Sequence, residues 1–261
     1  MFKVRHPVTE DIPDLLEIEF DRYKTLYKEQ PNKQQEIEER FRKRIKIASE
    51  WMWVIEEDKK VLGFITGQPT NEEPKDFTSW ESSTNNGTLE GKFFPRGQNV
   101  YVVNLDVKRQ ATVKNGQYIL MSYLGAKVIK EGKSRVIFES RMPGFREWVR
   151  EVKKMNSHQW NGLKQEVKQE MAEHYASLTT LRDGSEVLYD RLLRFYEEAG
   201  FTFIKVLPNA FEDVESLNYG VLCVGNNPVP KVLRVAPINF LAGFSLRIFG
   251  RSQKLLEKFV G

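Results

Sequence analysis

Residues 99–132 read NVYVVNLDVKRQATVKNGQYILMSYLGAKVIKEG, and this stretch decides the fold. Its first part, Asn99 to Val107, is dense in β-branched and aromatic side chains, which predicts a strand. The segment from about Asn115 to Glu131 has the composition of a helix, and Gly132 after it is a typical helix terminator. The sequence therefore predicts a strand that passes through a short basic loop into a helix.

Strands and helices are also expected on the N-terminal side of this stretch. Phe2 to Arg5 reads as a short strand, and Thr9 is expected to cap a helix whose apolar residues fall on one face. A second, highly charged helix is expected over residues 32–49. The β-rich runs 51–55 and 61–67 flank a short charged segment, which predicts a hairpin.

The C-terminal side continues the alternation of strands and helices. Ser185 is expected to cap a helix that runs to Ala199 and ends at Gly200. Strands are predicted over residues 135–139, 201–207 and 219–224.

Two segments, residues 69–97 and 142–183, are too long for simple connections and read as insertions. Residues 226–261 form a C-terminal tail that combines apolar and basic residues at helical spacing, which predicts a basic amphipathic helix. Such a helix docks on its own domain, docks on a partner subunit of a homodimer, or lies on a membrane surface. The sequence leaves these alternatives open.

Composition narrows the class of protein. Of 261 residues, 40% are hydrophobic and 12% aromatic, enough apolar surface for a sizeable core. The 40 Lys and Arg against 36 Asp and Glu give a net charge of +4, which argues against a nucleic-acid partner. A single cysteine, Cys223, forms no intrachain disulfide, and no secretory signal or long apolar run is visible, so a cytoplasmic location is expected.

The order of these elements resembles the GNAT N-acetyltransferase superfamily over about residues 2–225. The resemblance implies a mixed α/β (α+β) fold with a mostly antiparallel central sheet flanked by helices. It further implies that residues 1–225 form an acyl-coenzyme A-binding domain and residues 226–261 an appended tail. The segments SRMPGF and PNAFEDVESLNYGVLCVGNNP are similar to a branch of this superfamily also found fused to carbon–nitrogen hydrolases.

The basic loop corresponds to the family's phosphate-binding loop. The resemblance implies that main-chain N–H groups there hold the pyrophosphate of coenzyme A. The residues implied are Lys114, Asn115, Gly116, Gln117 and Tyr118. The loop departs from the family pattern at Val113 and Tyr118, and the basic residues Lys108, Arg109 and Lys114 either compensate by charge or form a solvated surface. The backbone of Leu105 and Val107 is implied to align with the acyl-pantetheine arm.

The segment LLRFYEEAGFTFIKVLPNAF is similar to a second family motif, which Tyr196, Glu197, Gly200 and Phe201 match position by position. The resemblance implies that Tyr196 protonates the leaving thiolate of coenzyme A, for which a phenol is a suitable acid. The alternative is a tyrosine whose ring packs against the sheet. Both remain open.

The general base is less defined. Asp106 and Glu139 are the carboxylates expected nearest the reaction centre, and each is otherwise an exposed or salt-bridged strand residue. The three histidines do not have a metal-ligand spacing, so no metal is expected. Trp80, Trp148 and Trp160 are expected to line an acceptor pocket or a channel for a long acyl chain, or to form local cores under the insertions.

The resemblance implies an N-acyltransferase with acetyl-coenzyme A, or another acyl-coenzyme A, as co-substrate. Its acceptor is expected to be a small-molecule or peptide amine, attacked directly through a tetrahedral intermediate. The alternatives are a catalytically degenerate binding domain, which keeps the fold but lost the loop, and a long-chain acyltransferase.

Overall fold

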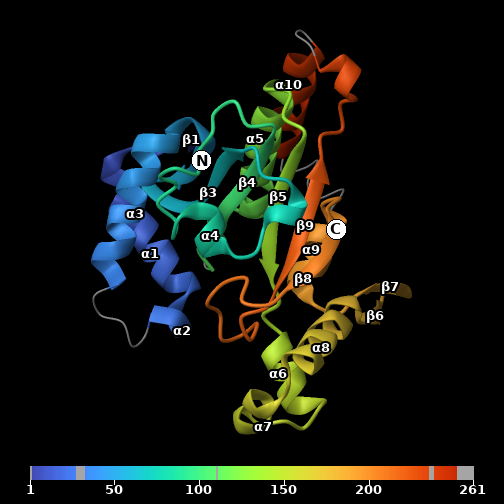
Figure 1. The fold of residues 1–261 in the computed structure, drawn as a ribbon. Helices are drawn as coiled ribbons and strands as arrows, with labels where there is room; N and C mark the ends of the chain where they lie inside the picture. The colour runs from blue at the N-terminus through green and yellow to red at the C-terminus, as the bar shows by residue number, and fades with distance from the viewer. Residues whose placement is uncertain (1, 28–32, 110, 235–237, 252–261) are drawn as a thin grey trace. The chain divides into compact units, whose positions relative to one another are not determined.

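The computed structural model describes residues 2–27, 33–109, 111–234 and 238–251 (Figure 1). The chain divides into two compact units. The first unit comprises Met1–Glu73, Ser83–Val136 and Asn226–Gly261, and the second comprises Pro74–Ser82 and Ile137–Gly225.

Four strands of the first unit lie in chain order as antiparallel neighbours. They are β1 (Lys3–Arg5), β2 (Met52–Glu57), β3 (Lys60–Thr70) and β4 (Asn99–Val107). Asp58 and Lys59 join β2 to β3 with positive φ angles of 49° and 65°, as a two-residue hairpin turn requires. The predicted hairpin and the predicted bounds of β4 are confirmed.

Helices cover both faces of these strands. α1 (Ile12–Arg22), α2 (Lys24–Tyr27) and α3 (Lys33–Ala48) are grouped on one side of them (Figure 1). Val54 belongs to the core cluster of α1 and α3, whereas Ile55, the next residue, contacts the first residue of α5 (Gly116–Lys130). Successive residues of a strand point to opposite faces, so α5 covers the other face.

The C-terminal helix α10 (Ile238–Arg251) packs on α5. A Cβ atom at Gly243 would lie 2.7 Å from the carbonyl oxygen of Ala126, so the two helices approach more closely than a side chain permits. The helix predicted in the tail is confirmed as far as Arg251, and its remainder lies outside the described residues.

The second unit contains most of β5 (Arg135–Arg141), most of β9 (Gly220–Asn226) and all of β8 (Thr202–Leu207). The first two residues of β5 and the last residue of β9 belong to the first unit. β8 and β9 pair antiparallel. The helices are α6 (Phe145–Glu151), α7 (Ser157–Gly162), α8 (Gln165–Ser177) and α9 (Arg191–Glu198). β6 (Thr179–Arg182) and β7 (Ser185–Leu188) form a separate hairpin.

An aromatic core holds the second unit together. The ring of Phe145 lies 5.2 to 6.1 Å from the rings of Trp148, Trp160, Tyr175 and Tyr219. Both tryptophans are buried, which favours the local-core alternative for them. Trp80 is half-buried, and its backbone N–H donates to the carbonyl of Ala210 at 2.7 Å.

Two predicted helix caps are wrong. Ser185 begins strand β7, because Asp183 and Gly184 form a tight turn with positive φ that folds the chain into a hairpin. Asp190 caps α9 instead, accepting hydrogen bonds from the N–H groups of Leu192 and Leu193. Thr9 lies inside a 3₁₀ turn that precedes α1.

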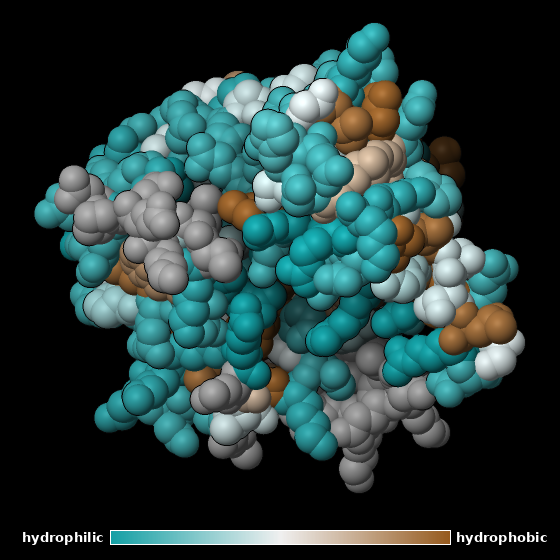
Figure 2. Space-filling model, turned by 90° about the horizontal axis from the view of Figure 1, so that it is seen from below, coloured by the Kyte–Doolittle hydropathy of each residue, from teal (hydrophilic) through white to brown (hydrophobic). Residues whose placement is uncertain are grey.

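None of the helices in the described part of the chain has the length and apolarity needed to cross a bilayer. The face seen in Figure 2 is mostly hydrophilic, with apolar residues in small separate patches.

Candidate functional site

The junction of β4 and α5 has the predicted form. β4 ends at Val107, and the N–H of Lys108 still donates to the carbonyl of Leu62 at 2.8 Å. α5 begins at Gly116. A Cβ atom there would lie 3.2 Å from a methyl group of Val107 and 3.4 Å from Ile55, so glycine lets the helix start close to the strands.

The start of α5 presents backbone donors. Ile119 donates its N–H to the carbonyl of Asn115 at 3.1 Å, as the first turn of a helix closes. The N–H groups before it have no acceptor within the helix, and the helix dipole places partial positive charge there. Lys114 is exposed beside them. This combination favours an anionic ligand.

One of the two loop residues that differ from the GNAT pattern, Val113, is buried. Val113 is only 5% exposed, so it fills the core beneath the loop instead of facing solvent. The hydroxyl of Thr112 donates to the carboxylate of Glu57 at the end of β2, which anchors the loop to the hairpin. Gln117 and Tyr118 are half-buried on the first turn of α5.

The end of β4 directs alternate side chains to opposite faces. Val107 contacts the position of Gly116, whereas Asp106 and Lys108 face α1. Oδ1 of Asp106 lies 3.8 Å from Nε of Arg22. Asp106 is 4% exposed, and these surroundings favour the salt-bridged alternative for it over a catalytic base.

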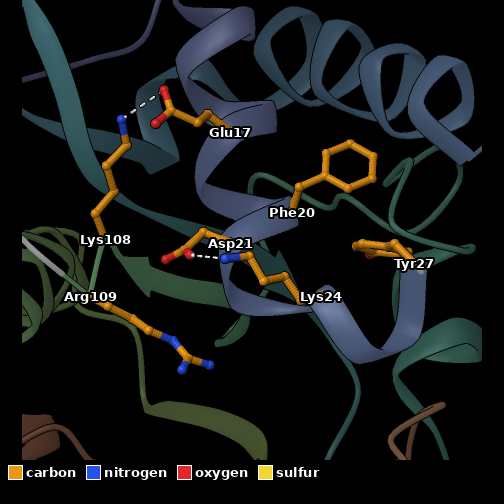
Figure 3. Close-up of a pocket in the computed structure, with 7 residues that line it drawn as sticks. All are labelled: Glu17, Phe20, Asp21, Lys24, Tyr27, Lys108 and Arg109. Carbon is orange, nitrogen blue, oxygen red and sulfur yellow. Dashed lines mark ion pairs between the residues drawn. The ribbon is translucent and has the colours of Figure 1, made fainter.

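An open pocket of about 870 Å³ lies between α1, α2 and the two residues that follow β4 (Figure 3). Its volume is in the range of small-molecule sites. It is lined by Glu17, Phe20, Asp21, Lys24, Tyr27, Lys108 and Arg109. The rings of Phe20 and Tyr27 lie 5.1 Å apart, edge to face, and form its apolar wall.

Charges of both signs surround this wall. Nζ of Lys108 lies 3.0 Å from a carboxylate oxygen of Glu17, and Nζ of Lys24 lies 3.3 Å from one of Asp21. The guanidinium of Arg109 extends from the loop below these pairs (Figure 3) and forms no ion pair with any other residue that the structure describes. Three cations therefore face two carboxylates.

A buried polar network supports the pocket from behind. The hydroxyl of Tyr27 donates to Oε1 of Glu19 at 2.9 Å, and Nε of Arg44 donates to the carbonyl of Gly87 at 2.5 Å. Burial raises the pKa of Glu19, although the charge of Arg44 opposes this. Burial lowers the pKa of Arg44 to about 10, and here the charge of Glu19 opposes it.

The structure brings one group of predicted residues together. Leu105, Asp106, Val107 and residues 114–118 all belong to the β4–α5 junction of the first unit. Tyr196 and Glu139 belong to the second unit. There the ring of Tyr196 lies 4.5 Å from that of Phe138, and Glu139 is a half-buried residue of β5. Their catalytic roles stay predictions.

The pocket residues of α1 and α2 were not predicted. Phe20 fitted the apolar stripe of an amphipathic helix, and Glu17, Asp21 and Lys24 fitted its solvated face. That pattern is common to many surface helices, so the sequence held no specific signal for them. Among the described residues, no group of His, Cys, Asp and Glu is arranged to hold a metal ion.

No family model matches the sequence. No curated protein matches it either. Solved structures are similar to this chain. The loading GNATL domain of CurA from Lyngbya majuscula superposes on it with a TM-score of 0.60 at 18% sequence identity. This match covers 87% of this chain and 98% of that domain.

The GNAT-like decarboxylase GphF, in complex with isobutyryl-coenzyme A, superposes with a TM-score of 0.61 at 17% identity. This match covers 86% of this chain and 99% of that one. Likeness at this identity establishes a fold, and the chain has the fold of the GNAT superfamily that its strand–loop–helix stretch predicts.

Proposed function

We propose that the protein is an acyl-coenzyme A-dependent acyltransferase whose acceptor is an amine. The observation that carries the proposal is the start of α5, packed on the end of β4 with backbone donors and Lys114 beside it. The similarity to a GNAT-like protein in complex with isobutyryl-coenzyme A supports the same ligand class. In this proposal, N–H groups of residues 114–118 bind the pyrophosphate.

The reaction is a direct transfer. The amine attacks the thioester carbonyl carbon, and a backbone N–H of β4 near Leu105 or Val107 stabilises the oxyanion of the tetrahedral intermediate. The carbon–sulfur bond then breaks, and Tyr196 supplies the proton that the thiolate takes up. The amine loses its proton to solvent or to a base, for which Glu139 remains a candidate.

Ligand binding tests this proposal without knowledge of the acceptor. Coenzyme A and acetyl-coenzyme A should raise the melting temperature, because a ligand of the native state stabilises it by about 2.7 kcal/mol at 100 times its Kd. Preference for a longer acyl chain would indicate a long-chain acyltransferase. No stabilisation by any acyl-coenzyme A would favour a degenerate binding domain instead.

A second candidate function is decarboxylation of a carboxyacyl-coenzyme A. It is favoured by the similarity to GphF, which is a GNAT-like decarboxylase, and by the cationic surplus of the pocket, which suits a carboxylate. Release of carbon dioxide from malonyl-coenzyme A, without any amine, would distinguish it from acyl transfer.

A further inference from the structure

We propose that the pocket between α1, α2 and the turn after β4 binds a zwitterionic acceptor, namely a free amino acid with a large apolar side chain. This rests on the proposed function, because it assigns the acceptor of that reaction. The assignment follows from the charges of the seven residues that line the pocket and from its apolar wall.

The carboxylate is assigned to Arg109. Lys24 and Lys108 each have a carboxylate partner, whereas Arg109 is exposed and forms no ion pair within the described parts of the chain. A guanidinium matches a carboxylate with two parallel hydrogen bonds, which makes it selective for this planar group. Lys108, whose side chain is 16% exposed, adds a second positive charge beside it.

The ammonium group is assigned to Glu17 and Asp21. They are four residues apart on α1 and therefore share one face of the helix. The side chain of Glu17 is 66% exposed, and that of Lys24 beside Asp21 is 76% exposed. Ion pairs with so exposed a partner are weak and exchange readily, so these carboxylates can accept a ligand ammonium.

The apolar side chain is assigned to the wall of Phe20 and Tyr27. The hydroxyl of Tyr27 is directed away from the pocket, to buried Glu19, so the tyrosine offers its ring. Edge-to-face contact with Phe20 fixes the orientation of both rings. An aromatic or large aliphatic side chain gains most from such a surface.

A variant of Lys114 distinguishes this site from the proposed phosphate-binding corner by experiment. The phosphates of coenzyme A share the anionic chemistry of a carboxylate, so Arg109 could serve either ligand. Lys114 lies in the same loop, is exposed and carries the same charge, but it does not line the pocket. It is therefore the matched control.

The test is calorimetric binding of phenylalanine, phenylalaninamide and coenzyme A to the full chain. Phenylalanine should bind more tightly than phenylalaninamide, which lacks the carboxylate. Arg109→Gln should weaken phenylalanine binding about 10- to 100-fold, the usual weight of hydrogen bonds to a charged group, and leave coenzyme A binding unchanged. Lys114→Gln should leave phenylalanine binding unchanged.

Equal affinity for acid and amide, no binding of either, or an Arg109→Gln defect in coenzyme A binding would each overturn the assignment. The proposed function is read separately, from acyl transfer and coenzyme A binding. Phenylalanine binding that depends on Arg109 without any acyl transfer would retain the pocket and reject the acyltransferase.

Discussion

The hydroxyl of Tyr27 donates a hydrogen bond of 2.9 Å to Oε1 of Glu19, which connects the pocket wall on α2 to a buried carboxylate on α1. Burial, and after it the charge of Glu19, raises the pKa of Tyr27 far above its usual range. The phenol therefore remains a hydrogen-bond donor near neutral pH. The wall and the network behind it form one unit.

Tyr27→Phe should destabilise the fold. The variant keeps the ring in the pocket but removes a donor from a buried carboxylate, a loss of about 1–3 kcal/mol. Urea unfolding measures it. Tyr189→Phe is the control, because Tyr189 is 48% exposed and no hydrogen bond of its hydroxyl is seen among the described residues. Equal stability of the wild type and Tyr27→Phe would show that this hydrogen bond contributes nothing to the free energy of unfolding.

The ion pair between Asp11 and Arg5 should make the stability of the fold depend on pH in the acid range. Burial raises the pKa of Asp11, but hydrogen bonds from Arg5 and from the N–H of Val8 outweigh it, and the net pKa is below the usual value of 3.8. A depressed carboxyl pKa adds stability that is present above the unfolded pKa and is lost as pH falls through the folded one.

Asp11→Asn should therefore lower stability near neutral pH and lose less of it between about pH 4 and pH 2. Chemical unfolding at several pH values measures this. A variant whose stability falls as steeply with acid as that of the wild type would place the acid sensitivity in other groups.

Gly116→Val should weaken both stability and coenzyme A binding. The added atoms meet Val107 and Ile55 where the start of α5 packs on the strands, and overpacking of this kind costs about 1–3 kcal/mol. Displacing the start of α5 also moves the N–H groups that the proposed site uses. Gly162→Ala is the control, since a Cβ atom there meets nothing within 4 Å. Thermal unfolding with and without coenzyme A measures both effects.

Asp190→Ala should loosen α9, the helix that carries Tyr196. The carboxylate of Asp190 accepts hydrogen bonds from two backbone N–H groups at the start of the helix. It also accepts a hydrogen bond of 2.8 Å from the buried hydroxyl of Tyr175. Loss of the cap costs about 1 kcal/mol and an unsatisfied phenol about 1–3 kcal/mol more. Asp190→Asn keeps one acceptor oxygen and should lose less stability than Asp190→Ala. Hydrogen exchange of the amides of α9 would show the difference between the two variants.

The elements with strong local signals were predicted to within a residue or two. Asn99 to Val107 combines strand propensity with burial, and the helix after it is closed at Gly132, whose φ is +66°. The false helix start at Ser185 has a local reason too. Asp183 and Gly184 are a common turn pair, and the hairpin that they make is short and exposed, so no apolar alternation marks it.

The strand–loop–helix corner of β4 and α5, where we propose phosphate binding, was predictable, and the pocket was not. The corner is formed by consecutive residues, so a motif in the sequence places it. The pocket needs residues of α1 and α2 beside Lys108 and Arg109, which follow 81 to 92 residues later in the chain. The alternation of side chains along β4 decides that Lys108 faces α1. Only the folded chain shows which of the surface charges of α1 face this pocket.

Tyr196→Phe tests the remaining prediction for the chemistry. The ring of Tyr196 contacts Phe138, Phe195 and Phe201 within the second unit, and phenylalanine preserves that packing because only the hydroxyl is removed. Coenzyme A affinity should therefore stay constant. If the hydroxyl protonates the leaving thiolate, turnover should fall by about 10²- to 10⁴-fold, the usual contribution of general acid catalysis. Steady-state kinetics with a saturating acceptor measures it, and an unchanged turnover would leave Tyr196 a packing role through its ring, which contacts Phe138, Phe195 and Phe201.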